Sequence, residues 1–150
     1  MGARSLVENG WKRPESVLVL VCSADRRVLL LERSAPAGYW QSVTGSLRWG
    51  ESPAMAARRE LYEETGLLAG SALLDLGVSR RFRIIQPWRA RYAPGVHENL
   101  EHWFALYLPG RRLVRLNPAE HTRYRWVSAG EAARRVFSST NREAILRYCG

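Results

Sequence analysis

The segment 45–67, GSLRWGESPAMAARRELYEETGL, constrains the fold most, because it places Glu60, Glu63 and Glu64 at the spacing of one helical face. Residues i, i+3 and i+4 project from the same side of a helix, so the three carboxylates lie together. Like charges at this spacing destabilise a helix unless a cation offsets them. Carboxylate oxygens are hard ligands that favour Mg²⁺, with Mn²⁺ as an alternative, over Zn²⁺. The segment therefore predicts a divalent-metal site suited to phosphate chemistry.

Capping signals bound this helix at both ends. Ser52 is a favoured N-cap residue, Pro53 suits the first helical position, and Gly66 suits the C-terminal cap. These signals predict a helix over residues 53–65. A small, mostly apolar stripe lies beside the glutamates and can pack on a core: Ala54, Ala57, Leu61 and Thr65.

The helix spacing alone leaves an alternative open, an ordinary solvated face on which Arg59 and Glu63 form an ion pair. The whole segment, however, resembles the Nudix box, G-x5-E-x7-R-E-U-x-E-E-x-G-U with U a bulky apolar residue, and matches it at every specified position. This resemblance implies a loop-helix-loop that binds Mg²⁺ and hydrolyses a nucleoside diphosphate linked to another group, or a similar phosphoanhydride. It further implies that Glu60, Glu63 and Glu64 bind the metal, while Arg59 orients the glutamates through ion pairs.

The composition is typical of one enzyme domain spanning residues 1–150. The hydrophobic content of 46% is normal, and no apolar run approaches the roughly 20 residues needed to cross a bilayer. Cys22 and Cys149 lie in or near apolar segments without a partner motif, so we expect reduced, structural thiols. These features together predict a cytoplasmic protein with no membrane segment.

The net charge of +9 comes almost wholly from arginine. Such a charge can serve nucleic-acid binding or the attraction of a polyanionic small molecule. The arginines are spread along the chain rather than gathered in one helix or tail, which favours a small-molecule triphosphate and makes a nucleic-acid partner a poor match. The sequence does not indicate an oligomeric state.

Hydrophobic patterning predicts alternating strands and helices without a linker or a repeat. We expect strands at 15–22, 27–32, 39–44, 73–85, 101–108 and 124–127. Helices are expected at 129–137 and 141–148, the second with Asn141 as its N-cap. This order indicates an α/β layered domain, and the Nudix resemblance implies a mixed β-sheet sandwiched between helices.

Segments outside the box resemble a narrower family, the dihydroneopterin triphosphate diphosphatases, which are bacterial folate-pathway Nudix enzymes. The matching segments are WKRPESVLVLV, YWQSVTGS, RYAPGV, EHWFALYLP, the pair Glu120-His121 and SSTNREAI. The resemblance implies that Glu120 is a further metal ligand from outside the box. It implies substrate contacts from Lys12, Arg33, Thr44, Phe82, Arg83, Ile84, Ile85 and Ser138. The chain departs from the family at Ser139, where a tryptophan is expected, and this affects the pocket wall more than the chemistry.

Each residue outside the box has an ordinary alternative. Without the resemblance, Glu120 is an exposed loop acid, and Lys12 and Arg33 are solvated charges.

Other residues are expected to have structural or minor roles. Glu101, an acid at a strand start, is expected to matter little, and Glu51, within the box, is expected to support the loop rather than to bind metal. Large aromatic residues are more often core than pocket wall: Phe82, Trp88, Trp103 and Phe104. The three histidines, His97, His102 and His121, lack metal-site spacing and receive no catalytic role.

The expected reaction is attack by a metal-activated water on the triphosphate, giving dihydroneopterin monophosphate and pyrophosphate. Glu63 and Glu120 are both open as the general base. Two other functions stay open. One is a dATP or other dNTP pyrophosphohydrolase of the same fold, and the other is a non-catalytic Nudix-fold module that binds nucleotides or RNA.

Overall fold

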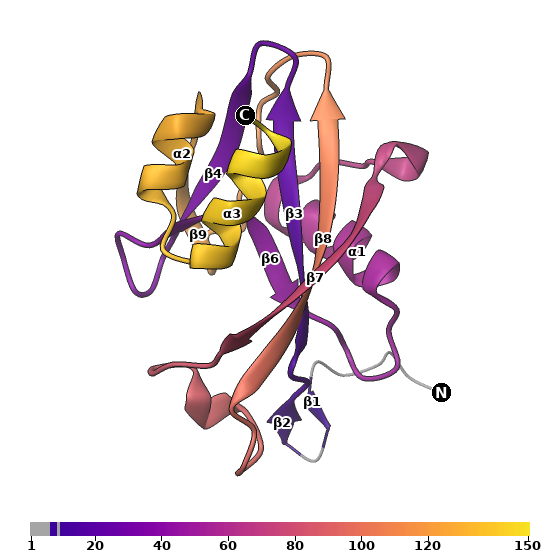
Figure 1. The fold of residues 1–150 in the computed structure, drawn as a ribbon, viewed down its shortest axis with the longest axis vertical. Helices are drawn as coiled ribbons and strands as arrows, with labels where there is room; N and C mark the ends of the chain where they lie inside the picture. The colour runs from indigo at the N-terminus through magenta and orange to yellow at the C-terminus, as the bar shows by residue number, and fades with distance from the viewer. Residues whose placement is uncertain (1–6, 9) are drawn as a thin grey trace.

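The computed structural model describes residues 7–8 and 10–150 (Figure 1). Its strands are β1 (Val7–Glu8), β2 (Trp11–Lys12), β3 (Glu15–Ser23), β4 (Arg27–Arg33), β5 (Trp40–Gln41), β6 (Val43–Ser46), β7 (Leu74–Arg83), β8 (Glu98–Leu108) and β9 (His121–Ser128). Its α-helices are α1 (Pro53–Thr65), α2 (Ala129–Arg135) and α3 (Ser139–Tyr148). Two short 3-10 turns, Gly70–Ala72 and Arg89–Arg91, complete the order.

Strand β3 lies at the centre of a seven-stranded mixed sheet with the order β5-β4-β3-β8-β7 (Figure 1). It runs parallel to β8, with residues 15–23 opposite residues 100–108. The antiparallel strand β4 meets β3 only where Cys22 faces Val28. The other end of β3 pairs with β6, and β4 pairs with β9 along most of its length. One parallel pair among antiparallel ones confirms the prediction of a mixed sheet.

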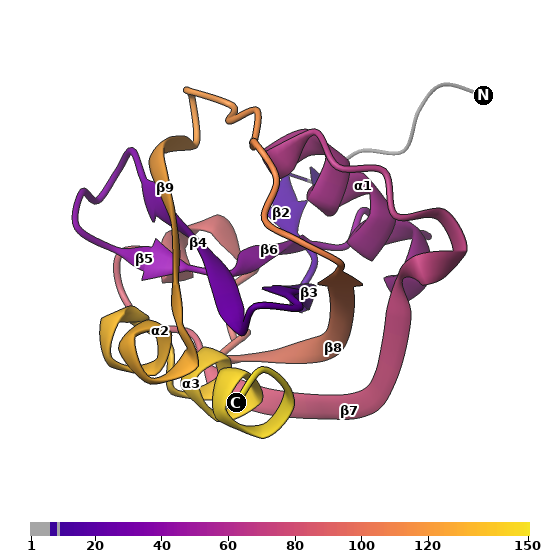
Figure 2. The same ribbon diagram turned by 90° about the horizontal axis from the view of Figure 1, so that it is seen from above.

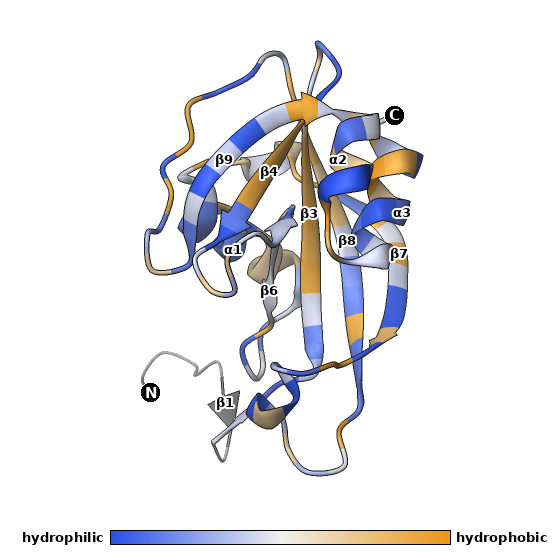
Figure 3. Ribbon diagram, turned by 90° about the vertical axis from the view of Figure 1, so that its left-hand side faces the viewer, coloured by the Kyte–Doolittle hydropathy of each residue, from blue (hydrophilic) through white to orange (hydrophobic). Residues whose placement is uncertain are grey.

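Helices cover both faces of this sheet. Figure 2 shows α1 on one side and α2 with α3 on the other. Along β3, Val17 and Val19 pack toward α1, and Leu18 and Leu20 pack toward α2 and α3, so successive side chains enter two separate cores. A strand buried on both faces has no polar alternation, and most of β3 and β4 is accordingly hydrophobic in Figure 3. The predicted sandwich is confirmed.

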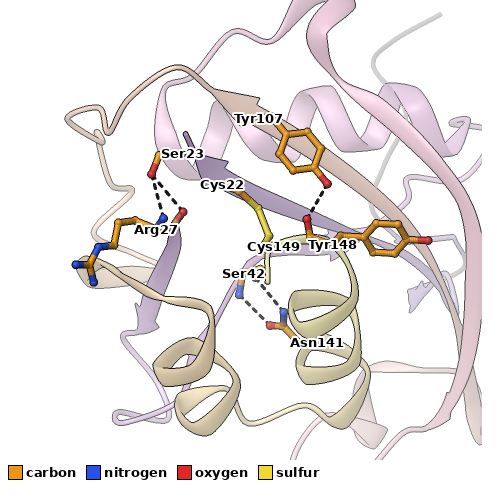
Figure 4. Close-up of a disulfide and its surroundings, with 8 residues drawn as sticks. All are labelled: Cys22, Ser23, Arg27, Ser42, Tyr107, Asn141, Tyr148 and Cys149. Atoms are coloured by element: carbon orange, nitrogen blue, oxygen red, sulfur yellow. Dashed lines mark hydrogen bonds between the residues drawn. A yellow bond between two sulfur atoms is a disulfide. The ribbon is translucent and has the colours of Figure 1, made fainter. Parts of the chain in front are cut away.

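The chain around Ser42 differs from the prediction of one strand over 39–44. Two strands, β5 and β6, flank Ser42, whose backbone N–H donates to Asn141 Oδ1 at 2.9 Å, while Asn141 Nδ2 donates to Ser42 Oγ at 2.9 Å (Figure 4). The prediction that Asn141 caps α3 is wrong. Ser138 is the cap, since its Oγ accepts from the Asn141 backbone N–H at 3.3 Å. The buried Asn141 side chain instead connects α3 to the sheet.

The two cysteines form a disulfide, Cys22–Cys149 (Figure 4). Their Cα atoms lie 6.1 Å apart although 127 residues separate them in sequence. The prediction of reduced thiols is therefore wrong for this structure, because α3 packs across β3 and brings Cys149, the residue that follows the helix, next to Cys22. A partner motif could not reveal this pairing, since it depends on tertiary packing alone. The cytoplasmic location that was inferred together with reduced thiols stays a prediction.

Several strand ends also differ from the sequence prediction. Strand β8 begins at Glu98 rather than at 101, because residues 98–100 pair with the end of β7 through their backbones and need no apolar pattern. Strand β9 covers His121–Ser128 rather than 124–127, and β7 ends at Arg83 rather than 85. Among the helices of the described residues, none combines the length and the apolar character that a membrane crossing requires.

Candidate active site

Helix α1 has the predicted bounds and caps. Ser52 Oγ accepts from the Met55 backbone N–H at 3.2 Å, and Gly66 ends the helix in the left-handed region at φ 75°. Glycine adopts that region without the strain that a side chain brings. Ala57 and Leu61 are fully buried against the sheet, which fixes the rotation of the helix about its axis and hence which acids face inward.

Arg59 connects the loop before α1 to two of its acids. Its guanidinium donates to both carboxylate oxygens of Glu51, from Nε at 2.9 Å and from Nη2 at 2.8 Å. Nη1 donates to Glu60 Oε1 at 2.7 Å and to Glu63 Oε2 at 3.2 Å. Glu51 in turn accepts from the Arg48 backbone N–H at 2.9 Å. The geometry agrees with the expected roles, in which Arg59 orients glutamates and Glu51 supports the loop.

Glu60 and Glu64 form a buried acidic pair. Their exposed fractions are 6% and 1%, and Glu64 Oε1 has no hydrogen-bond partner among the described residues. Burial raises the pKa of both carboxyls, and for Glu64 the neighbouring charges of Glu60 and Glu120 raise the pKa further. Hard oxygen donors held this close, with one of them unpartnered, suit a divalent cation such as Mg²⁺.

The third box glutamate, Glu63, does not join this pair. It is 41% exposed, and its carboxylate pairs with Arg59 at 3.2 Å and with Arg48 at 3.6 Å. Glu120 does approach the pair, since it lines the same cleft and its charge acts on Glu64. As their side chains stand, no three acids, histidines or cysteines within the described residues already enclose a metal position. The donor set that the structure brings to the cleft is Glu60, Glu64 and Glu120.

The cleft has a volume of about 720 Å³ and runs between the acids of α1 and the start of α3. It is lined by every residue predicted to contact substrate: Lys12, Arg33, Thr44, Phe82, Arg83, Ile84, Ile85 and Ser138. Two of the predicted site residues, Arg59 and Glu63, do not line it. The cleft therefore combines segments from β2, β4, β6, β7 and the α3 cap that are far apart in sequence.

A group of cations lies beside the acids. Burial, together with the charges of Arg91 and Arg33, lowers the pKa of Lys12 from 10.5 to about 8. Glu60 and Glu120 act in the opposite direction, which places Lys12 between the cations and the carboxylates. Its ammonium also lies 5.7 Å from the centre of the Tyr92 ring. Cations at this position suit a polyphosphate chain whose other oxygens face a metal.

Aromatic residues form part of the cleft wall. Phe82 lines it, as the resemblance implies, and Trp88 also lines it although its residue type favoured the core. Trp103 and Phe104 are buried as expected. The Trp88 ring lies 5.9 Å from that of Phe137, which stacks on Tyr39 at 4.4 Å. Such rings offer flat apolar surface to a planar ligand.

Glu101 lies in the cleft, a position that the sequence did not indicate. Its side chain is 4% exposed, and burial raises its pKa. His121 also lines the cleft, 2% exposed, with its pKa lowered to about 4 by burial and by Arg33. It is therefore neutral at pH 7, and its 3.9 Å approach to Glu64 Oε1 is not an ion pair. Sequence spacing gave no sign of either residue, because packing of β8 and β9 places them.

Comparison with known proteins identifies the fold. The family model of the NUDIX domain matches residues 12–148. The chain belongs to the Nudix family. This membership confirms the family and the fold predicted from the box, and Nudix hydrolases generally use divalent metal ions, in agreement with the buried carboxylates.

Similar Nudix proteins cover nearly the whole chain. The dihydroneopterin triphosphate diphosphatase of Escherichia coli (strain K12) is 41% identical over 142 residues, which are 92% of this chain and 93% of that protein. The dihydroneopterin triphosphate diphosphatase of Haemophilus influenzae is 38% identical over 92% of this chain and 89% of its own length. The solved structure of the E. coli dihydroneopterin triphosphate pyrophosphohydrolase matches with a TM-score of 0.87 and 40% identity, over 93% of this chain and 97% of that chain.

Proposed function

We propose that this protein hydrolyses 7,8-dihydroneopterin triphosphate to dihydroneopterin monophosphate and pyrophosphate. One observation carries the proposal: a single cleft holds the Glu60–Glu64 pair and all eight residues that the resemblance assigns to this substrate. The similarity to dihydroneopterin triphosphate diphosphatases over 92% of the chain supports it.

In this proposal, Glu60, Glu64 and Glu120 hold the divalent metal, and Mg²⁺ is the preferred ion because their donors are hard carboxylate oxygens. When bound, the metal neutralises phosphate charge and lowers the pKa of a coordinated water. Arg59 keeps Glu60 in place through the 2.7 Å contact, so that the carboxylate remains directed into the cleft. Lys12 and Arg33 bind the triphosphate oxygens and orient the chain for attack.

The general base in this scheme is Glu120. Of the two acids left open by the sequence, Glu63 lies outside the cleft in ion pairs with Arg48 and Arg59, which favours Glu120. Glu120 lines the cleft, and in this proposal its carboxylate accepts the proton of the attacking water.

A substrate panel tests the proposal. With Mg²⁺, we expect kcat/KM for dihydroneopterin triphosphate to exceed that for dATP and GTP by at least ~10-fold, because a pocket with fixed polar groups rejects the wrong ring edge. Pyrophosphate should be the released product, and chelation of divalent ions should stop its release. A panel in which dATP equals or exceeds the pterin would favour the dNTP pyrophosphohydrolase. Ligand binding without metal-dependent pyrophosphate release would favour the binding module.

The lowered pKa of Lys12 predicts that activity declines at alkaline pH. Because its pKa in the folded protein is lowered to about 8, its ammonium loses its proton above that pH and no longer attracts the triphosphate. We expect kcat/KM, which reports the free enzyme, to fall as pH rises through about 8. Lys12→Arg should keep its charge and move this decline to higher pH. Identical alkaline profiles for the two proteins would show that Lys12 does not set the limit.

A further inference from the structure

Glu101 is a buried carboxylate that the proposed chemistry does not use. It lies on β8 opposite Ser16 of β3, lines the cleft, and is 4% exposed. Within the described residues, no lysine or arginine forms an ion pair with it. A carboxylate rarely remains buried in this way unless its oxygens are engaged by hydrogen-bond donors.

Hydrogen-bond donors in the part of the chain that the structure describes engage one oxygen of this carboxylate. Glu101 Oε1 accepts from Trp103 Nε1 at 3.0 Å and from Thr140 Oγ1 at 2.8 Å. Thr140 Oγ1 lies 2.9 Å from Ser138 Oγ, which itself accepts from the Asn141 backbone N–H. An amide N–H can only donate, so Ser138 is free to donate to Thr140, and Thr140 to Glu101. Oε2 accepts no hydrogen bond from the described residues, although Glu101 lines the cleft.

A second unpaired acceptor lies two residues earlier on the same strand. Asn99 is 1% exposed and lines the cleft, and its Nδ2 donates to Ser16 Oγ at 2.7 Å. Its Oδ1 is buried without a partner among the described residues. Residues i and i+2 of a strand share one face, so Asn99 and Glu101 lie on the same face of β8, and both line the cleft. Buried acceptors are normally satisfied, so this surface lacks donors that a ligand can supply.

We propose that Glu101, together with Asn99, recognises the edge of the substrate ring that carries two neighbouring N–H donors. That edge is the 2-amino-4-oxopyrimidine edge, in which a protonated ring nitrogen adjoins an exocyclic amino group, and pterin and guanine share it. Adenine presents an unprotonated ring nitrogen beside its amino group. That nitrogen is an acceptor, so it would face an acceptor oxygen of the protein and form no hydrogen bond with it. This inference deepens the proposed function and rests on it for the choice of pterin. It assigns Glu101 to ring specificity, with Ser138 and Thr140 as positioning residues.

Glu101→Gln tests the assignment with almost no change of shape. The glutamine oxygen can still accept from Trp103 and Thr140, and its amide NH₂ then faces the ring donors in place of Oε2. We expect kcat/KM for dihydroneopterin triphosphate and for GTP to fall by at least ~100-fold, and that for dATP to change by less than ~3-fold, because mispaired buried polar groups discriminate strongly. Glu98→Gln on the same strand is the matched control, since Glu98 is exposed and lies outside the cleft lining.

A binding measurement separates ring recognition from hydrolysis. Calorimetric titration of 7,8-dihydroneopterin, which has no phosphate, into the metal-free protein should show an affinity that Glu101→Gln weakens by at least ~10-fold. Asn99→Ala leaves Glu101 and its donors in place and should reduce the preference for pterin over adenine by at least ~5-fold. It serves as the second variant if Glu101→Gln does not fold. An unchanged pterin-to-adenine ratio in both variants, or an equal loss for every substrate, would overturn the inference.

The same panel distinguishes this inference from the proposed function. If the unaltered protein prefers the pterin and Glu101→Gln retains that preference, the function stands and the role of Glu101 is wrong. If the unaltered protein prefers GTP over both the pterin and dATP, and Glu101→Gln abolishes that preference, Glu101 is supported while the pterin substrate is rejected. A protein that prefers dATP to both would contradict the two proposals together.

Discussion

Glu64→Gln is expected to lower kcat by at least ~100-fold, because charge stabilisation in phosphoryl transfer depends on the metal that this carboxylate would hold. Glu64 is the most deeply buried acid of the cleft, at 1% exposure. Glu63→Gln is the matched control. It makes the same change on the same helix, but Glu63 is 41% exposed and forms its ion pairs outside the cleft. We therefore expect kcat to change by less than ~5-fold, as is usual for a surface charge.

Stability should change in the opposite direction. Burial and neighbouring carboxylates raise the pKa of Glu64 above its value in an unfolded chain, so its ionisation destabilises the metal-free fold as pH rises through and beyond the unfolded value. Glutamine removes this cost. We expect a metal-free Tm at least ~2 °C above the unaltered protein at pH 8, which corresponds to about 1 kcal/mol for a domain of this size. At pH 4 the difference should shrink, because the carboxyl is then protonated in both states.

Calorimetric scans with and without Mg²⁺ complete this test. The unaltered protein should gain stability on adding the ion, and Glu64→Gln should lose most of that gain. Near-normal turnover in Glu64→Gln, or equal losses in Glu63→Gln and Glu64→Gln, would contradict the division of the acids that the structure shows.

Gly45→Ala is expected to reduce kcat by at least ~100-fold without unfolding the protein, since it displaces a metal-site carboxylate. A Cβ at Gly45, on β6, would overlap the carboxyl group of Glu60, and no backbone atom is among its close neighbours. The backbone of Gly45 is not in the left-handed region, so alanine adds no strain there. The added methyl group therefore displaces the carboxyl end of the Glu60 side chain and moves it away from Glu64.

Two further variants sharpen this prediction. Gly110→Ala is a neutral control, because a Cβ at Gly110 meets nothing within 4 Å and needs no special backbone angle. Glu60→Asp combined with Gly45→Ala shortens the displaced side chain by one methylene and should recover part of the activity. Steady-state kinetics and thermal melting would measure both effects. Full activity in Gly45→Ala would show that Glu60 need not occupy its observed position.

The box could be predicted from the sequence because its signals are local. Helical spacing, Ser52 and Gly66 fix α1 without reference to the rest of the chain, and the helix has the predicted bounds. The distinction between Glu63 and Glu64 was also accessible in principle. Leu61 is buried, and Glu63 lies about 200° round the helix from it at 100° per residue, whereas Glu64 returns toward the buried side. The predicted metal set includes all three glutamates because the apolar stripe beside them was recognised but not used to distinguish one glutamate from another.

The remaining site residues depend on contacts between distant segments. Glu101 and Thr140 meet because the first turn of α3 packs over β8, and no spacing in the sequence records that approach. The same packing brings the Asn141 side chain to Ser42. Asparagine is a residue type that often caps helices, but here its side chain connects α3 to the sheet. The resemblance supplied Lys12, Arg33 and Ser138 as single positions, and only the fold shows that they share a cleft.

The parallel pairing of β3 with β8 has a consequence for how the chain acquires its structure during synthesis. Residues 15–23 emerge from the ribosome well before their partners at 100–108, because the paired positions 15 and 100 lie 85 residues apart in the sequence. Until then the most apolar strand has one open edge, and local hairpins cannot close it, because a parallel partner requires a long connection. Such non-local contacts slow folding and prolong the exposure of aggregation-prone surface. The central strand that supports both layers of the finished protein is therefore the segment of the nascent chain that most needs protection.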